Sequence, residues 1–280
     1  MTFQPVLFGS GYSAWKLLQK TLAGQQKTFD GSAQIARDTD YFAAKIGSVT
    51  GIDQLISDRR LLGVALGAFG LTDQINSTAM IRQVLTQGTA SATALANRLP
   101  DKRWLAFAET FNFAAGGTPN TATQGFATKI VSAYRSQSFT AAVTAEDRSL
   151  GTALQMQSAI PNLASSSVSE SAKWYSVMGS TSMRQMMETA LGLPASIVTI
   201  DIDRQLTIFQ NRAAQVFGDG SVSQFSDPAK MDKLLRLYLT RSQFSGGAIG
   251  GGAAASSPAL QLLGSAATSP SASGIAALFS

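Results

Sequence analysis

The sequence predicts an all-α, multi-helical protein in which a long helix joins two weakly related helical units and a flexible tail follows. Apolar residues recur every three or four positions, which is the spacing of one helix face, and Val and Ile do not gather in alternating runs. A stretch of the first half resembles a stretch of the second half. The residues after Arg241 carry no charge.

Residues 1–115 are expected to form the first unit, with five helices that each have an apolar face. The predicted faces contain Tyr12, Trp15, Leu18 and Leu22; Ile35, Tyr41, Phe42 and Ile46; Ile52, Leu55, Ile56, Leu61, Leu62, Ala65, Leu66 and Phe69; Ile75, Ala79, Met80 and Val84; and Trp104, Leu105, Ala108 and Phe111.

The third of these helices has the clearest predicted ends. Thr50 is a good N-cap, and Asp53 follows three residues later in a pair that resembles a capping box. Gly70 is well placed to end the helix, because glycine adopts a left-handed conformation at little cost. The fourth helix is expected over residues 73–86 with Gly88 as its stop, and the fifth follows Pro100.

Residues 116–160 are expected to form the connecting long helix, as one helix or two in tandem, ended by Pro161. Residues 161–241 form the predicted second unit, which begins with a polar loop and continues with helices over 182–191, 201–217 and 228–241. Asp227 before Pro228 is a strong helix start. Residues 217–225 are interpreted as a turn between helices.

Residues 242–280 are predicted to be a disordered tail rich in Gly, Ala and Ser, because such a composition buries too little apolar surface to offset its ordering entropy. Two apolar clusters in it, 260–263 and 275–279, are at most short docking elements.

A weak internal repeat relates the two units. Ala68-Phe69-Gly70-Leu71 aligns with Ala190-Leu191-Gly192-Leu193, and an aromatic pair and a Gly-Ser precede each copy. A helix that ends in glycine follows each copy, at Gly88 and Gly218. The repeat is a hypothesis that predicts two related helical units.

The absence of His and Cys excludes several kinds of chemistry. Disulfides, Cys or His zinc sites, thiolate nucleophiles and Ser-His-Asp arrangements are all impossible. The net charge of +5 attracts anions, but the basic residues are spread over the chain without a basic run, so no nucleic-acid partner is expected. No segment has the length and apolarity of a membrane span, and the N-terminus does not resemble a cleaved signal peptide.

Two groups of charged residues are candidate sites. Arg59 and Arg60 are candidate ligands of a phosphate or a carboxylate, but the preferred interpretation is the solvent face of an amphipathic helix. The acid pairs are candidate ligands of a hard cation, although each lies near a predicted helix start, where acids favour the helix dipole. These pairs are Asp38 with Asp40 and Asp201 with Asp203.

Three further features are interpreted as structural. Ser13 to Lys16 matches an S-x-x-K pattern without its companion elements. Gly246 to Gly252 is rich in glycine, but neither a preceding strand nor a following Gly-Lys makes it a phosphate loop. Seven aromatic residues are expected in the core, with partner contact as the alternative for some: Trp15, Tyr41, Phe42, Trp104, Phe107, Trp174 and Tyr175. No catalytic, cofactor-binding or metal-binding residue is therefore assigned, and no cofactor or small-molecule substrate is expected.

The segments "FQPV", "RDTDYFAAKIGSVT", "DRRLLGVALGAFGL", "IRQVL" and "ANRLPDKRW", in this order from Phe3 to Phe113, resemble domain-of-unknown-function family 1217. The second half fits the family less clearly. The resemblance implies no activity and no site residues. Members are often encoded in flagellar gene clusters, so it implies a flagellum-associated role.

We therefore expect a non-enzymatic structural or assembly protein that contacts other proteins, in particular flagellar components. It would be cytoplasmic, or exported to the flagellum without a cleaved signal. The alternatives are a cytoplasmic adaptor or export chaperone for a flagellar subunit, and an enzyme or metal binder that depends on carboxylates.

Overall fold

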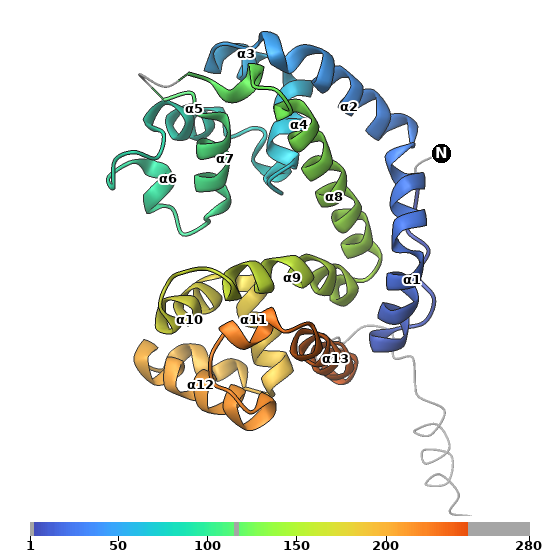
Figure 1. The fold of residues 1–280 in the computed structure, drawn as a ribbon, viewed down its shortest axis with the longest axis vertical. Coiled ribbons are helices and arrows are strands. Elements are labelled where there is room, and N and C mark those ends of the chain that lie inside the picture. The colour runs from blue at the N-terminus through green and yellow to red at the C-terminus, as the bar shows by residue number, and fades with distance from the viewer. Residues whose placement is uncertain (1–2, 115–117, 246–280) are drawn as a thin grey trace, which may run out of the picture. The chain divides into compact units, whose positions relative to one another are not determined.

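The computed structural model describes residues 3–114 and 118–245, and within these ranges the protein contains helices and no strands (Figure 1). This confirms the all-α prediction. The tail was predicted from residue 242, but residues 242–245 are the last turn of a helix that ends at Ser245. The rest of the predicted tail, with its apolar clusters and the Gly246–Gly252 segment, lies outside the described residues. The helices are α1 (Gly11–Asp30), α2 (Ala33–Lys45), α3 (Ile52–Ser57), α4 (Arg59–Gly67), α5 (Thr78–Gln87), α6 (Leu95–Arg98), α7 (Arg103–Phe111), α8 (Phe126–Glu146), α9 (Arg148–Ala164), α10 (Glu170–Gly179), α11 (Thr181–Leu191), α12 (Ile202–Phe217) and α13 (Pro228–Ser245).

Residues Met1–Ser242 form one compact unit that contains two hydrophobic cores. The first core is built from α2 to α7 and the N-terminal part of α8. The second core is built from α1, the C-terminal part of α8 and α9 to α13. This grouping differs from the expected first unit of residues 1–115, because Trp15 and Leu18 of α1 are buried in the second core.

The connecting segment is two helices and not one. Asp147 separates α8 from α9, and its carboxylate accepts hydrogen bonds from the backbone N–H groups of Ser149 and Leu150, as an N-cap does. Helix α9 continues through Pro161 to Ala164. A Cβ atom on Gly151 would lie 2.0 Å from the hydroxyl of Thr144, so only glycine fits where α9 leaves α8.

The predicted third helix is also broken, at Asp58. This residue has an extended backbone, and its carboxylate accepts hydrogen bonds from the N–H groups of Arg60 and Leu61, which makes it the N-cap of α4. Thr50 is not the N-cap of α3: Gly51 is, and the side chain of Gln54 reaches back to the N–H groups of Thr50 and Gly51. A capping carboxylate inside an apolar pattern is easily mistaken for a surface charge.

One other boundary differs from the sequence prediction, and two helices were missed. The fourth helix starts at Thr78 and not at Asp73, because a short 3-10 turn occupies Thr72–Gln74. Ala79 is consequently exposed, although Gly88 ends the helix as expected. Helices α6 and α10 were not predicted. The expected starts of α11, α12 and α13 agree with the structure within one residue.

The aligned Ala-x-Gly-Leu segments of the weak repeat adopt the same helix-ending conformation. Gly70 has φ 69° and Gly192 has φ 68°. Leu71 N–H donates to the carbonyl oxygen of Leu66 at 2.9 Å, and Leu193 N–H donates to that of Glu188 at 2.8 Å. Each glycine N–H bonds a carbonyl three residues back, which completes a Schellman motif in both copies. The hypothesis of two related units is therefore supported at this point of the backbone.

Helix α8 is packed closely against α4 through a glycine. The ring of Tyr134 lies over Gly67, where a Cβ atom would be 2.7 Å from a ring carbon. Tyr134 also contacts both hydrophobic cores. The absence of a side chain at residue 67 therefore sets how near α4 comes to α8.

We expect Gly67→Ala to lower the free energy of unfolding by about 1–3 kcal/mol, since the new methyl group forces the Tyr134 ring to move. Urea unfolding of the purified protein measures this loss. Gly63→Ala is the matched control one turn earlier, where the added Cβ atom lies 3.7 Å from Ile75. The control should be neutral or gain about 0.5–1 kcal/mol from helix propensity. Equal stability of the two variants would contradict the packing described above.

Candidate functional site

The predicted arginine pair lies at the start of α4, and both side chains are engaged with neighbouring residues. Arg59 donates to the Asn76 side chain at 2.9 Å. Arg60 lies 4.9 Å from the centre of the Tyr41 ring, and its Nε is 3.5 Å from Asp38 Oδ1. Of the predicted site residues, the structure thus brings Arg60 together with Asp38.

A groove of about 860 Å³ runs beside this pair, and Arg59, Arg60 and Arg103 line it together with the glycine face of α4. Arg103 is held by the carboxylate of Asp101 at 2.7 Å and donates to the carbonyl of Gly70. The hydrogen bond to Asp101 raises the pKa of Arg103 above its ordinary value and outweighs the opposite effect of burial. The groove therefore does not present three free cations to an anion.

The predicted acid pairs do not converge on a shared position. Asp38 accepts from Gln34 at 2.6 Å, whereas Asp40 is exposed. Asp201 is the N-cap of α12, as expected for an acid at a helix start, and Asp203 accepts from the hydroxyl of Tyr175 at 2.6 Å. Within the part of the chain that the structure describes, no three acidic side chains gather as metal ligands.

The S-x-x-K match has separate structural uses. Ser13 donates to the backbone carbonyl of Ser10, and Lys16 forms an ion pair with Asp232 at 2.8 Å. Among the seven aromatic residues, five are buried and the two tyrosines are not: Tyr41 is half-buried and donates to Asp58 at 2.7 Å, and Tyr175 is exposed. The core interpretation therefore holds for the tryptophans and phenylalanines.

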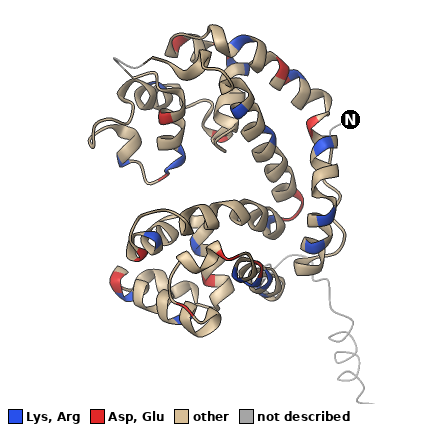
Figure 2. Ribbon diagram, viewed as in Figure 1, with Lys and Arg blue, Asp and Glu red and all other residues tan. Residues whose placement is uncertain are grey.

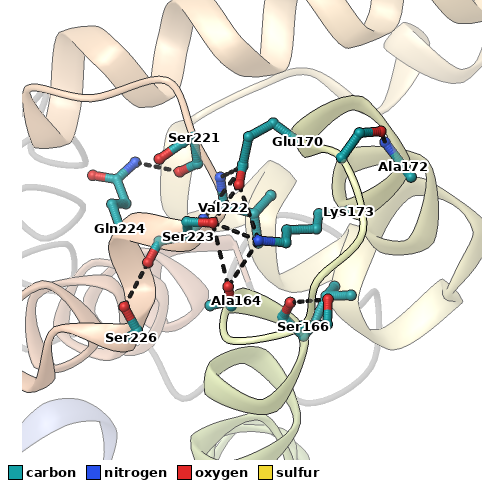
Figure 3. Close-up of polar contacts among 12 residues, drawn as sticks. Ala164, Ser166, Glu170, Ala172, Lys173, Ser221, Val222, Ser223, Gln224 and Ser226 are labelled. Atoms are coloured by element: carbon teal, nitrogen blue, oxygen red, sulfur yellow. Dashed lines mark hydrogen bonds and ion pairs between the residues drawn. The ribbon is translucent and has the colours of Figure 1, made fainter.

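A polar cluster that the sequence analysis missed joins α9, α10 and the loop before α13 (Figure 3). Lys173 is 4% exposed, and its ammonium group donates to Glu170, to the hydroxyl of Ser223 and to the carbonyl of Ala164. Glu170 also accepts hydrogen bonds from the backbone N–H of Val222, at 2.8 Å, and from that of Ser223. We call these residues the 170–223 clasp.

The clasp has the residue types of a Ser-Lys nucleophile but the wrong arrangement for one. A catalytic lysine needs a free lone pair to take the proton of serine. Lys173 has three donors, and all three are used by acceptors at 2.5 to 3.0 Å. The groups instead connect the C-terminal end of α9, the start of α10 and residues 222–223, which lie in the 217–225 segment expected to be a turn.

Hydrogen bonds in the clasp also set the acidity of its carboxylate. Burial would raise the pKa of Glu170, but hydrogen bonds from Ser223, Lys173 and the backbone of Val222 and Ser223 lower it below its ordinary value. The i, i+3 spacing of Glu170 and Lys173 was the available signal in the sequence. It was missed because the polar loop was expected to include Glu170 and no helix was predicted between that loop and residue 182.

Two comparisons with known proteins relate the chain to a family and to a solved structure. The family model described as "Protein of unknown function (DUF1217)" matches residues 68–231, which is more than half of the chain. The chain belongs to the DUF1217 family. This confirms the resemblance seen in the sequence, although the matched span extends into the second half and includes the clasp. No curated protein matches the chain.

The DUF1217 chain is similar to the crystal structure of protein AGR_C_984 from Agrobacterium tumefaciens. The TM-score is 0.69 at 26% sequence identity, over 86% of this chain and 97% of that one. The two proteins thus share a fold over nearly their whole lengths. Among the described residues of the DUF1217 chain, no helix has the length and apolarity to cross a membrane.

Replacing the clasp lysine in Lys173→Met should lower the free energy of unfolding by about 1–3 kcal/mol, because the buried carbonyl of Ala164 loses its donor and the partly exposed Glu170 loses its ion-pair partner. Urea unfolding measures the loss. Lys20→Met, at an exposed lysine, is the control and should change stability by less than about 0.5 kcal/mol. Adding Glu170→Gln to Lys173→Met should recover part of the loss; an additive further loss would contradict the pairing.

The clasp also predicts acid sensitivity. Because the pKa of Glu170 is lower in the folded state than its ordinary value of 4.5, its stabilising contribution is complete above that pH and is lost as the pH falls through the folded value. Glu170→Gln should therefore destabilise the protein most near neutral pH, and the difference from wild type should shrink between about pH 5 and pH 3. Thermal unfolding across this range tests it, with Glu146→Gln at an exposed site as the control. A constant difference would count against the assignment.

Proposed function

We propose that this DUF1217 protein is a flagellum-associated structural or assembly protein that acts by protein-protein contacts and performs no catalysis. The flagellar setting is supported by what the family resemblance implies about gene neighbourhood. The absence of catalysis is supported by the use of the described polar clusters, whose donors and acceptors cap helices and join segments of the fold.

One observation carries the part of the proposal that concerns contacts. Between α11 and α12, three β-branched apolar side chains alternate with Thr199 and Asp201 and are exposed: Val198 by 60%, Ile200 by 37% and Ile202 by 46%. We call these three residues the 198–202 surface. Exposed apolar residues that cluster are typical of protein interaction sites. Tyr175, whose hydroxyl binds the adjacent Asp203, is also exposed.

The alternative is a cytoplasmic adaptor or export chaperone that holds a flagellar subunit on the same surface. Fractionation separates the two proposals. A structural component should be present in purified basal bodies, hooks or filaments, and a chaperone should be present only in the cytoplasmic fraction.

Deletion of the gene should reduce flagellation and swimming, and Ile200→Asp/Ile202→Asp should reproduce the defect while the protein stays folded. Electron microscopy of flagella and the diameter of swimming halos in soft agar measure the effect. Ala79→Asp/Gln83→Asp, on the exposed face of α5, is the charge-matched control and should swim normally. Leu66→Asp, in the first core, should instead unfold the protein. Normal flagellation of the deletion strain would refute the proposal.

A further inference from the structure

The net charge of the protein is confined to two helices. Helix α1 has three lysines and one acid, and α13 has four basic residues and one acid. The whole chain has 22 basic and 17 acidic residues, so removing the seven basic and two acidic residues of these helices leaves fifteen of each. The entire charge of +5 therefore belongs to α1 and α13, and the remainder of the chain is neutral (Figure 2).

These two helices, from opposite ends of the sequence, are joined by polar contacts. The carboxylate of Asp232 in α13 accepts from the hydroxyl of Tyr12 at 2.7 Å and from the ammonium of Lys16 at 2.8 Å. Arg236, one turn further along α13, also lowers the pKa of Asp232 by its charge, after the larger effects of burial and of the bonds from Lys16 and Tyr12. Asp232 is thus surrounded by basic groups from both helices.

The lysines of α1 form a single row. Lys16, Lys20 and Lys27 are spaced i, i+4 and i+11, with Ala23 at i+7, so all four lie on one face over about 16 Å of helix. This is the spacing with which one helix contacts another along a seam. The buried residues of α1, including Trp15 and Leu18, lie on the opposite face.

Two of the three lysines in this row have no acidic side chain beside them. Within the described residues, Lys16 is paired with Asp232, while Lys20 and Lys27 are exposed and have no acid within ion-pair distance. Leu17 flanks the row and is 38% exposed. The face thus offers two free ammonium groups, a small alanine and an exposed leucine at the positions where a second helix would lie.

From this arrangement we infer that the 16–27 face of α1 docks an acidic α-helix of a partner protein, whose Asp or Glu side chains pair with the lysine row and whose apolar residues contact Ala23 and Leu17. This deepens the proposed function, on which it rests, by naming the chemistry of the partner. Complementary charge of this kind steers association and fixes register.

A membrane or nucleic acid fits the same face less well. The backbone of Val6, near the exposed N-terminal end, is hydrogen-bonded to Gln25, which lies on the side of α1 opposite Lys16. The exposed apolar residues there and the lysine row therefore face different directions and could not contact the same bilayer surface. The row has no bidentate arginine, and the one ring beside it, Tyr12, lies under the Lys16 ammonium and donates its hydroxyl to Asp232, so no ring is interleaved between Lys20 and Lys27 for a base to stack on.

A photo-crosslinking residue placed at Ala23 in the full-length chain, in motile cells, tests the inference. Mass spectrometry should identify a crosslinked peptide that is an acidic helical segment of one protein. Lys20→Glu/Lys27→Glu should reduce this crosslink by about tenfold or more, since two attractions become repulsions. Lys45→Glu/Lys129→Glu, with the same change of charge at exposed sites, should leave it unchanged. Reversing the two facing acids of the partner to lysine should restore the crosslink to the first variant.

Several outcomes would overturn the docking face: no crosslink, a crosslinked peptide without acids, no rescue by the partner's reversal, or a species removed by nuclease. Binding of the purified chain to vesicles of phosphatidylcholine with phosphatidylglycerol, lost in Lys20→Glu/Lys27→Glu, would assign the face to lipid and refute it equally. Two results separate a failure of the docking face from a failure of the proposed flagellar function. Normal swimming of Lys20→Glu/Lys27→Glu beside a non-flagellated deletion strain would reject only the docking face. A crosslink that the partner's reversal rescues, together with normal flagellation and swimming of the separate deletion strain, would reject only the flagellar role.

Discussion

Helix α8 contributes buried residues to both hydrophobic cores, and the rest of the structure depends on this shared helix. Phe126 and Ile130 near its start belong to the first core, and Phe139 and Val143 near its end belong to the second. Its 21 residues span about 30 Å, which is long enough to serve two cores in succession. Tyr134 lies between the two sets and contacts both cores. Any shift of α8 along its axis would therefore disturb the packing of both cores.

Several charged side chains in this protein hydrogen-bond backbone groups at helix ends. Asp58, Asp147 and Asp201 each satisfy the free N–H groups at a helix start. Arginines act at the other end of helices: Arg103 donates to the carbonyl of Gly70, and Arg241 donates to that of Ala190 at 2.6 Å. These two contacts lie at the same Ala-x-Gly-Leu motif in the two units. Aspartates and arginines, which suggest a catalytic or binding site when seen in the sequence, here bind the ends of helices.

The fold class and most helices could be predicted because apolar spacing reports local periodicity. Gly70, Gly88 and Gly218 were recognised as helix ends because a positive φ favours glycine regardless of tertiary context. The break at Asp58 was missed because an N-cap inside an apolar pattern looks like a surface acid. The spacing of Glu170 and Lys173 indicates only their own pairing, because Ser223, the third member of the 170–223 clasp, lies 50 residues from Lys173. The sequence prediction placed α1 in the first unit and was wrong for the same reason, because no nearby residue indicates which core its apolar face joins.

The placement of α1 in the second core determines when its apolar face is buried during translation. During synthesis the first core can close once residue 130 has left the ribosome, because its members lie between Phe42 and Ile130. Trp15 and Leu18 emerge earlier, yet within the second core α1 packs against α8 and α9. The apolar face of the N-terminal helix therefore stays unburied until α8 and α9 have been translated. This interval is the period in which a nascent chain is most exposed to chaperones and to aggregation.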